Sequence, residues 1–469
     1  MTFYQKWRQR VYPLILFIVL SGPFATNADD QQAFQNAIKT LFPHTQVGLQ
    51  VINLKTGDIP LDINGHTLFT PASVMKILTA AVALKILGPN YQCHTDLYQK
   101  GEDYYLQFNN DPTLLYAGLI KLFAPLKGKT IAGNLVIVIN NDGFPPYSQK
   151  SQLEDNLGCT GNPMDGAMID SNTAEFMMKH GQKAGDALIF EPLKNHLGFT
   201  IVNEAKTCAC DDTMPFSCEL DREELENGVR IYGCYDQKYP DKKICFPVTH
   251  TQKKLRAALT NVLQELHIQL KGQLVFDQPL PQTAKRINQV HSSPIKEMLD
   301  EVLSMSDNLI ARTLFIKALK KARPDFYKWD QVDTLLKEIL PQYFDLQDIE
   351  HCHFHEGVGS STTQSITPAF INSLLAAIAH DSSLSTLIRN TLAQPGKRST
   401  YKNRLPELKG NLWVKTGYMS YLTNLAGYMK TQKGTSLAFT IFVNHIPLSL
   451  RQDKLQRLDQ LVKAIYDTL

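Results

Sequence analysis

Two residues near position 75 have the types and the spacing that serine–lysine chemistry needs. Ser73 precedes Lys76 by three positions, so on a helix both side chains lie on one face, a single turn apart. Thr70 is a favourable N-cap and Pro71 suits the first helical position, which predicts a helix over about 71–87. A lysine amine buried there has a lowered pKa and can take the proton of the serine hydroxyl. Ser-x-x-Lys is nevertheless common by chance, and most such pairs lie on solvated helix faces.

A second short motif contains Ser306, Asp307 and Asn308, at the end of an amphipathic stretch. In an irregular turn, Ser306 and Asn308 can point into one cleft, where the serine relays a proton and the amide holds a substrate peptide. The alternative is a plain helix-capping turn, for which these residue types are the usual choice.

The third motif is Lys415-Thr416-Gly417, after an expected strand at 411–414. A lysine and a threonine hydroxyl beside a cleft can bind a carboxylate, and a glycine lets a substrate backbone approach closely. The same triplet at 55–57 shows that chance also supplies it, so the alternative is an ordinary strand-to-turn exit.

The order of the three motifs decides between these interpretations. Ser-x-x-Lys, Ser-x-Asn and Lys-Thr-Gly follow one another, each in the expected helix, turn or strand, and in this the chain resembles the penicillin-recognising serine enzymes. It looks most like the class C low-molecular-mass penicillin-binding proteins, the D-alanyl-D-alanine carboxypeptidase/endopeptidase family, in the phrases at 68–73, 110–114 and 306–311. The long interval at 77–305 is similar to the large insert that this family carries.

Two segments depart from the family pattern. Tyr418 follows the Lys-Thr-Gly triplet, where the family usually has serine or threonine. Glu356-Gly357-Val358-Gly359 replaces the family's Asp-Gly-Ser-Gly. Both segments are expected to border the cleft, so the substrate preference stays open.

The resemblance implies a mixed α+β fold of the penicillin-recognising serine transpeptidase/β-lactamase type. Such a fold has an antiparallel sheet flanked by helices, here interrupted by a large, mostly β insert. It implies a periplasmic serine DD-peptidase, a D-Ala-D-Ala carboxypeptidase or DD-endopeptidase or both, that acts on peptidoglycan stem peptides. β-Lactams would be its covalent inhibitors, and no cofactor or metal is implied.

The resemblance also assigns roles to the motif residues. The catalytic residues are Ser73 as nucleophile, Lys76 as general base, Ser306, with Lys76 or Lys415, as proton donor to the leaving amine, and Asn308 as the group that positions the peptide. The terminal carboxylate is bound by Lys415 and Thr416, beside Gly417. A serine β-lactamase is an alternative, although no deacylating glutamate can be identified. A non-catalytic cell-wall binding protein is another, against which the intact Ser73–Lys76 pair argues.

The first 28 residues predict export from the cytoplasm. Lys6, Arg8 and Arg10 precede an apolar run at 14–20 that is too short for a membrane-spanning helix, and Ala28 ends a cleavage-like sequence. These three cations account for the formal net charge of +3, so no basic patch indicates nucleic acid. We expect a periplasmic protein without a stable membrane span.

The density of cysteines and the change in residue pattern along the sequence predict the domain boundaries of the mature chain. With 43% hydrophobic and 20% charged residues, the composition is that of a packed globular protein. We expect a signal peptide at 1–28, a catalytic domain in two parts, 29–95 and 285–469, and an inserted region at 96–284 with one helix near 252–266. Eight cysteines fit an oxidising compartment, and we expect at least two disulfides, with open pairing, among Cys159, Cys208, Cys210, Cys218, Cys234 and Cys245.

Two further cysteines and three histidines lie outside this cluster. Cys93 and Cys352 are expected to be buried thiols. His351, His353 and His355 alternate, so in a strand they would share one face, either as a zinc site or as a partly exposed polar surface.

Overall fold

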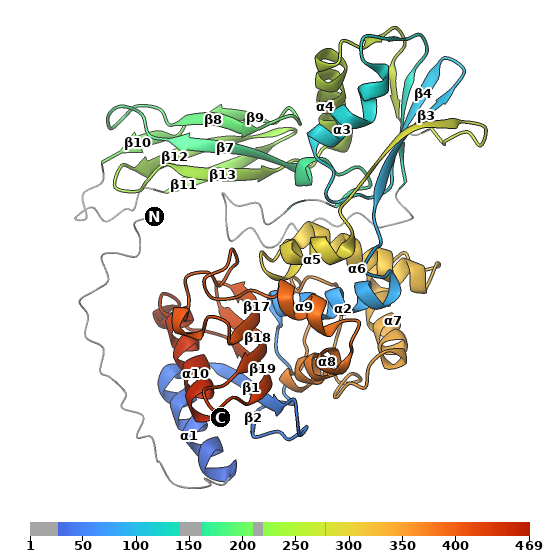
Figure 1. Cartoon of the computed structure of the whole chain (residues 1–469). Helices are drawn as coiled ribbons and strands as arrows, with labels where there is room; N and C mark the ends of the chain where they lie inside the picture. Colours follow the sequence, from blue (N-terminus) through green and yellow to red (C-terminus); the bar gives the residue numbers. More distant parts are fainter. Residues whose placement is uncertain (1–26, 141–161, 163, 210–218, 277) are drawn as a thin grey trace.

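The computed structural model describes residues 27–140, 162, 164–209, 219–276 and 278–469 (Figure 1). Most of the expected signal peptide at 1–28 therefore lies outside the described residues. Within the described ranges, no helix is both long enough and apolar enough to cross a bilayer.

A five-stranded antiparallel sheet joins the two ends of the chain. Its order is β17 (Leu412–Met419), β18 (Leu422–Lys430), β19 (Ser436–Asn444), β1 (Gln46–Asn53) and β2 (Leu61–Ile63). β19 pairs with β1 over eight positions, with Gln46 opposite Asn444. Most of the strand expected at 411–414 forms the start of β17.

Alternate residues of this sheet face two different helical layers. On β18, Leu425 and Met429 pack with α1 (Asn27–Leu41) and α10 (Lys454–Thr468). Ala426 and Tyr428 on the same strand belong to the core that contains α8 (Pro368–His380). Because side chains alternate along a strand, the sheet is buried on both faces.

The helical layer that contains α8 is built around α2 (Lys76–Ile86), nine of whose residues are buried. α2 packs against α5 (Ile295–Leu303) and α6 (Asn308–Ala322), and also contacts α8 and α9 (Ser385–Thr391). α7 (Val332–Ile339) adds its buried face to the same core. The core thus fixes the helix that follows Ser73 on several sides.

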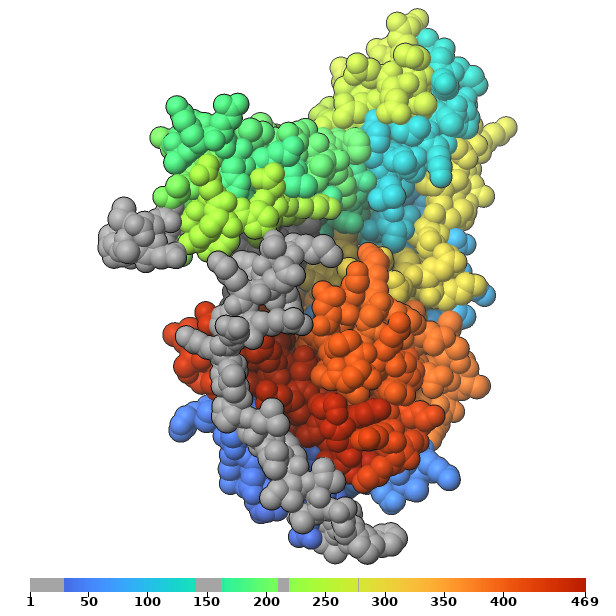
Figure 2. Space-filling view, turned by 60° about the vertical axis from the view of Figure 1, so that its left-hand side comes forward, coloured from blue at the N-terminus to red at the C-terminus, as the bar shows by residue number. Residues whose placement is uncertain are grey.

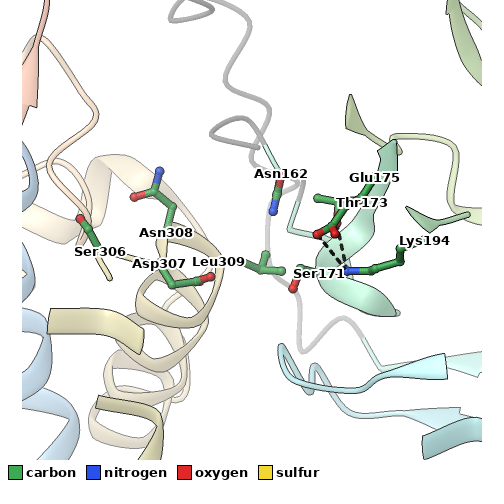
Figure 3. A pocket seen from close by; sticks show the side chains of 9 residues that line it. All are labelled: Asn162, Ser171, Thr173, Glu175, Lys194, Ser306, Asp307, Asn308 and Leu309. Atoms are coloured by element: carbon green, nitrogen blue, oxygen red, sulfur yellow. Dashed lines mark hydrogen bonds and ion pairs between the residues drawn. The ribbon is translucent and has the colours of Figure 1, made fainter. Parts of the chain in front are cut away.

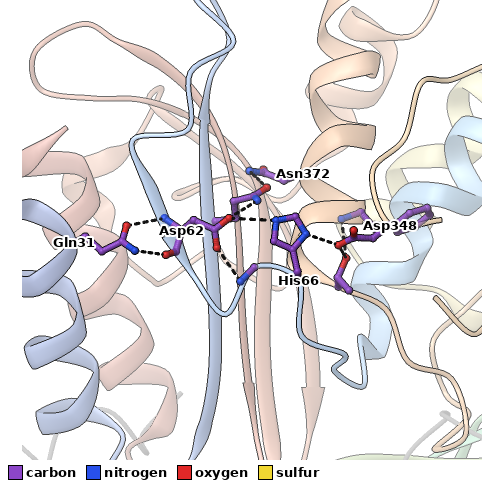
Figure 4. Close-up of polar contacts among 9 residues, drawn as sticks. Gln31, Asp62, His66, Asp348 and Asn372 are labelled. Atoms are coloured by element: carbon purple, nitrogen blue, oxygen red, sulfur yellow. Dashed lines mark hydrogen bonds and ion pairs between the residues drawn. The ribbon is translucent and has the colours of Figure 1, made fainter. Parts of the chain in front are cut away.

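The segment that leads to this helix is tied down by a polar network (Figure 4). The Asp62 carboxylate accepts hydrogen bonds from Gln50 Nε2 at 2.8 Å and from the Gly65 backbone N–H at 2.9 Å. His66 Nδ1 lies 2.7 Å from the carboxylate of Asp348, and Gln31 Nε2 donates to the Asp62 carbonyl. These contacts link α1, the end of β2 and the loop at 348.

The inserted region contains a second five-stranded sheet, which belongs to a separate core. Its order is β15 (Leu274–Phe276), β6 (Leu135–Ile139), β4 (Asp103–Phe108), β3 (His94–Lys100) and β16 (Lys285–His291). β16 pairs antiparallel with β3. The boundaries expected at 96 and 284 therefore cut β3 and leave out β16, because cross-strand pairing is not visible in local composition.

Two helices, rather than the one expected, accompany this sheet. α4 (Thr251–Glu265) is the predicted one, and α3 (Tyr116–Phe123) was not expected. α3 is a short helix whose buried positions, Leu119, Leu122 and Phe123 among them, complete the core of the insert. A two-stranded pair, β5 (Thr130–Ile131) and β14 (Gln269–Leu270), lies beside them.

The remainder of the insert is made of short strands, as predicted. One sheet has the order β13 (Lys242–Pro247), β7 (Thr173–Lys179) and β8 (Ile189–Lys194). The other contains β10 (Lys206–Cys208), β12 (Gly228–Asp236) and β11 (Leu220–Leu225), with β9 (Thr200–Asn203) also on β12. In Figures 1 and 2 these strands project over the catalytic part of the chain.

The cysteines and histidines are placed as follows. Cys93 and Cys352 are buried free thiols, and burial raises the pKa of each to about 12. Three of the six clustered cysteines lie outside the described residues: Cys159, Cys210 and Cys218.

The three alternating histidines do not lie on a strand. Only His353 forms a single β-bridge, with Ser365, and His351 is in a turn. Within the described ranges no three His, Cys, Asp or Glu side chains are grouped to hold a metal ion.

Candidate active site

The side chain of Lys76 brings the first two motifs together. Its Nζ lies 2.8 Å from Ser73 Oγ and 2.7 Å from Asn308 Oδ1. Ser306 Oγ is 3.4 Å from the same nitrogen. One amine is therefore within reach of two serine hydroxyls and an amide oxygen, although the two motifs are 230 positions apart in the chain.

The turn that carries Ser73 differs from the expected helix start. Ala72–Met75 forms a 3₁₀ turn, η1, and the α-helix begins only at Lys76, so Thr70 is not the N-cap. Two strand residues hold the Thr70 backbone instead. Its N–H donates to Asn444 Oδ1 at 2.8 Å, and its carbonyl accepts from Asn424 Nδ2 at 2.8 Å. The central sheet thus fixes the chain three residues before the nucleophile.

Left-handed backbone angles surround this turn. Ala72 has φ of 46° and Ser306 has φ of 68°, which non-glycine residues adopt only when their surroundings impose it. Gly359 has φ of +83°, and a Cβ there would lie 1.8 Å from the Ala72 carbonyl oxygen. Only glycine fits at 359, so the Glu-Gly-Val-Gly segment packs directly on the serine turn.

Burial sets the charge state of Lys76. Loss of hydration lowers its pKa from 10.5 to about 7, while the carboxylates of Glu356 and Asp307 oppose this by favouring the charged form. Arg312 acts in the same direction as burial. Near neutral pH a large fraction of this amine is therefore uncharged and able to accept a proton.

Lys415 lies in the same buried environment. Its side chain is fully buried, and its Nζ donates to the Thr416 carbonyl at 3.0 Å. Burial, and then the charge of Lys76, lower the pKa of Lys415 well below its usual value. A Cβ on Gly417 would lie 2.8 Å from the Pro71 carbonyl oxygen, so β17 lies close against η1 at this glycine. The third motif is thus beside the first.

The two segments that depart from the family pattern differ in burial, because Tyr418 is exposed to solvent and Glu356 is buried. Tyr418 is 61% exposed, and the Lys454 ammonium lies 4.0 Å from the centre of its ring. Glu356 was expected to border the cleft but is fully buried. Its carboxylate accepts backbone N–H groups of Val358 at 2.9 Å and Ser360 at 2.5 Å, so it shapes the loop that contacts Lys76. Val358 places its carbonyl 3.4 Å from Lys76 Nζ.

Sequence reasoning missed Asn424 and Asn444 as parts of the site. Asn424 and Asn444 are buried amides in strands that are largely apolar. Because a buried polar group needs a partner, such residues are themselves a signal of a fixed contact. The sequence does not reveal that the partner is the backbone of Thr70.

Comparison with known proteins agrees with this geometry. Residues 32–465 match the D-Ala-D-Ala carboxypeptidase 3 (S13) family. The chain belongs to this family. It is therefore a serine-type D-Ala-D-Ala carboxypeptidase, and the mixed α+β fold is of the penicillin-recognising type, as the resemblance implied.

Individual relatives cover nearly the whole chain. The D-alanyl-D-alanine carboxypeptidase DacB of Haemophilus influenzae is 26% identical in an alignment of 455 residues that covers 91% of each chain. The crystal structure of penicillin binding protein 4 (dacB) from that organism has a TM-score of 0.79 at 24% identity, and covers 95% of this chain and 100% of its own. A predatory peptidoglycan endopeptidase of Bdellovibrio bacteriovorus has a TM-score of 0.53 at 16% identity, covering 90% and 92%.

Proposed function

We propose that this carboxypeptidase is a periplasmic DD-peptidase that cleaves peptidoglycan stem peptides through an acyl-enzyme on Ser73. One observation carries the proposal: a buried lysine amine with a pKa of about 7 lies 2.8 Å from a serine hydroxyl. A base with a pKa near the working pH is the most effective for proton transfer.

In the acylation step the Lys76 amine takes the proton from Ser73 Oγ as this oxygen attacks the carbonyl of the penultimate D-Ala. Backbone N–H groups, including that of Ser73, stabilise the resulting oxyanion. The proton passes through Ser306 to the nitrogen of the terminal D-Ala, the C–N bond breaks, and the amino acid leaves. Water then hydrolyses the ester, with Lys76 again as base.

The second and third motifs, at 306–308 and 415–417, orient the substrate. Asn308 accepts and donates hydrogen bonds along the peptide on the acyl side of the scissile bond. Lys415 and Thr416 bind the terminal carboxylate, with Gly417 allowing its close approach. A carboxylate next to Lys415 favours the charged ammonium, whose formation burial opposes.

A fluorescent penicillin, followed over time, tests the reaction. We expect a lasting adduct on Ser73, located by mass spectrometry, that the Ser73→Ala variant does not form. Ser383→Ala, at an exposed serine on the surface, is the matched control and should label like the wild type. Rapid loss of the adduct would indicate a β-lactamase. An adduct on another serine, or none, would overturn the assignment.

The periplasmic location rests on the N-terminal pattern of cations, apolar run and Ala28, and cleavage would leave Asp29 as the first residue. Sequencing the N-terminus of protein recovered from periplasmic extract tests this. A chain that starts at Met1 in that fraction would contradict cleavage.

A further inference from the structure

A hollow on the insert lies apart from the catalytic cleft. The cavity beside Asn308, of about 280 Å³, belongs to that cleft because Ser306 also lines it (Figure 3). The hollow, of about 520 Å³, is instead lined by the start of α3, the end of α4 and the loop before β9, which lie away from α2 in Figure 1. Its described lining residues are Tyr116, His196, Asn261, Gln264, Glu265 and His267. None of these belongs to the three motifs, so the catalytic reaction does not account for the hollow.

Two stacked rings form the aromatic part of this hollow. The rings of Tyr116 and His196 have centroids 4.0 Å apart, and their planes differ by only 8°. Tyr116 is buried, whereas 43% of the His196 side chain is exposed. Because the tyrosine covers one face of the imidazole, the exposed surface lies on its other face and its edges. The hollow therefore offers a flat ring supported from behind.

Hydrogen bonds fix both rings in place. The carboxylate of Asp170, in η4 (Asp170–Asn172), accepts the Tyr116 backbone N–H at 3.1 Å and lies 3.0 Å from His196 Nδ1. Nδ1 therefore carries a proton, and Nε2 of the neutral ring is left as an acceptor. Burial, and then the hydrogen bond of its hydroxyl to Glu265 at 3.1 Å, raise the pKa of Tyr116 to about 12. A ligand thus meets groups that are already positioned, which lowers the entropy lost on binding.

Planar polar side chains surround the rings. Asn261, Gln264 and Glu265 are exposed and lie three and four positions apart at the end of α4, so they share one face of the helix. His267 follows them, also exposed. No Lys or Arg occurs among the described lining residues, and both Glu265 and the carboxyl end of α4 carry negative charge. The hollow therefore favours neutral groups that donate hydrogen bonds and disfavours anions.

We propose that this hollow binds a neutral sugar unit of a glycan strand. A pyranose ring has a C–H face that packs on an aromatic ring, and hydroxyl groups that pair with amides, carboxylates and imidazoles. An apolar ligand would leave the amides of Asn261 and Gln264 with poorer partners than water. A metal ion is disfavoured, because the described residues contain no group of three metal-ligating side chains.

The identity of the glycan rests on the proposed function. In peptidoglycan the stem peptides are attached to strands of β-linked, N-acetylated amino sugars. The hollow holds such a strand while the catalytic cleft acts on a stem peptide. The insert is thereby a second point of attachment to the polymer, and a linked second contact raises the effective concentration of the substrate.

Calorimetric titration with chitotetraose, a neutral β-linked oligomer of N-acetylglucosamine, tests the hollow without any reaction. We expect saturable binding by the wild type. Gln264→Ala should weaken it about 2- to 12-fold, the value of one hydrogen bond between neutral groups. His196→Ala removes the exposed ring and should weaken it about tenfold. On isolated sacculi Gln264→Ala should act more slowly than the wild type, while its kcat/KM for a short acyl-D-Ala-D-Ala peptide stays within about twofold.

Gln252→Ala is the matched control, because Gln252 is an exposed amide on the same helix but does not line the hollow. It should bind chitotetraose like the wild type, and normal acylation by penicillin checks that each variant is folded. Absence of saturable binding by the wild type, or equal affinity in Gln264→Ala and Gln252→Ala, would overturn the glycan site. Failure of the proposed function would instead appear as chitotetraose binding by a protein that forms no penicillin adduct on Ser73.

Discussion

Lys76 is subject to two opposing influences at the scale of single residues. Removal from water favours its neutral amine, whereas Glu356 and Asp307 favour the ammonium. The outcome, a pKa of about 7, leaves the group able to accept a proton and to return it within one catalytic cycle. The buried Glu356 therefore influences the charge state of Lys76 through its own negative charge.

This balance predicts the acidic limb of the pH profile. Because the working form is the neutral amine, and its pKa is lowered, kcat/KM should rise about tenfold per pH unit below pH 7 and level off above it. Glu356→Gln removes the carboxylate that most favours the ammonium form of Lys76. The rise of kcat/KM with pH should therefore occur at lower pH in this variant than in the wild type. Initial rates with a neutral acyl-D-Ala-D-Ala peptide provide the measurement. A limb near pH 10 in the wild type would contradict Lys76 as base.

For Lys415 we expect an effect on activity that depends on the terminal carboxylate of the substrate. Lys415→Ala should lower kcat/KM for D-Ala-D-Ala peptides by about 10- to 150-fold, the value of a charge-assisted hydrogen bond of about 1.5–3 kcal/mol. A substrate with an amidated terminus already lacks this contact and should lose far less. The two substrates and two proteins form a thermodynamic cycle. Equal losses on acid and amide would assign Lys415 to proton transfer or to structure.

At the scale of secondary-structure elements, the central sheet positions the nucleophile. β18 and β19 supply Asn424 and Asn444, and β17 supplies Gly417, against which the 3₁₀ turn packs. Helix α2 extends from that turn into a core that fixes Lys76. The distance between Ser73 and Lys76 thus depends on the sheet and the helical layer together.

Asn444→Ala tests this dependence. The variant leaves the Thr70 N–H without its acceptor, which should cost about 1–3 kcal/mol in the free energy of unfolding and slow acylation by penicillin. Thr440→Val on the same strand is the control, since among the described residues its buried hydroxyl has no hydrogen-bond partner. Denaturant unfolding and acylation rates are the measurements. Normal acylation by Asn444→Ala would show that the strand does not position the serine.

Local patterns were enough to predict the elements whose contacts repeat along the chain. The helices α2 and α4, the first part of β17 and the order of the three motifs could be predicted from the sequence. The 3₁₀ turn at Ala72–Met75 was not, because it depends on asparagines more than 350 positions away. The inward orientation of Glu356 depends on its own loop closing around it, and the position of β16 depends on pairing with a distant strand.

At the scale of the whole molecule, the insert begins and ends at adjacent strands, β3 and β16, so it adds a unit without separating the catalytic elements. We propose that the boundary lies just outside these strands rather than at 96 and 284. Its strands β7 and β8 return toward the active site and form one wall of the cavity beside Asn308. The insert thus extends the cleft.

The insert should be stabilised by at least two disulfides among the cysteines from 159 to 245. Export and the density of cysteines motivate this prediction. Each bridge should contribute about 2–4 kcal/mol. Peptide mapping of periplasmic protein without reductant is the measurement, with a reduced sample as control. Six free thiols would refute the prediction.

The pairing of β1 with β19 has a consequence for biosynthesis. The carbonyl and N–H of Thr70 acquire their partners only when Asn424 and Asn444 have been synthesised and have reached the sheet. A polypeptide that stops short of these residues still contains the entire Ser-x-x-Lys motif but lacks the two side chains that hold the Thr70 backbone. We therefore expect prematurely terminated or half-translocated chains to hydrolyse peptide much more slowly than the full chain, so that activity appears only after the last strand has been added.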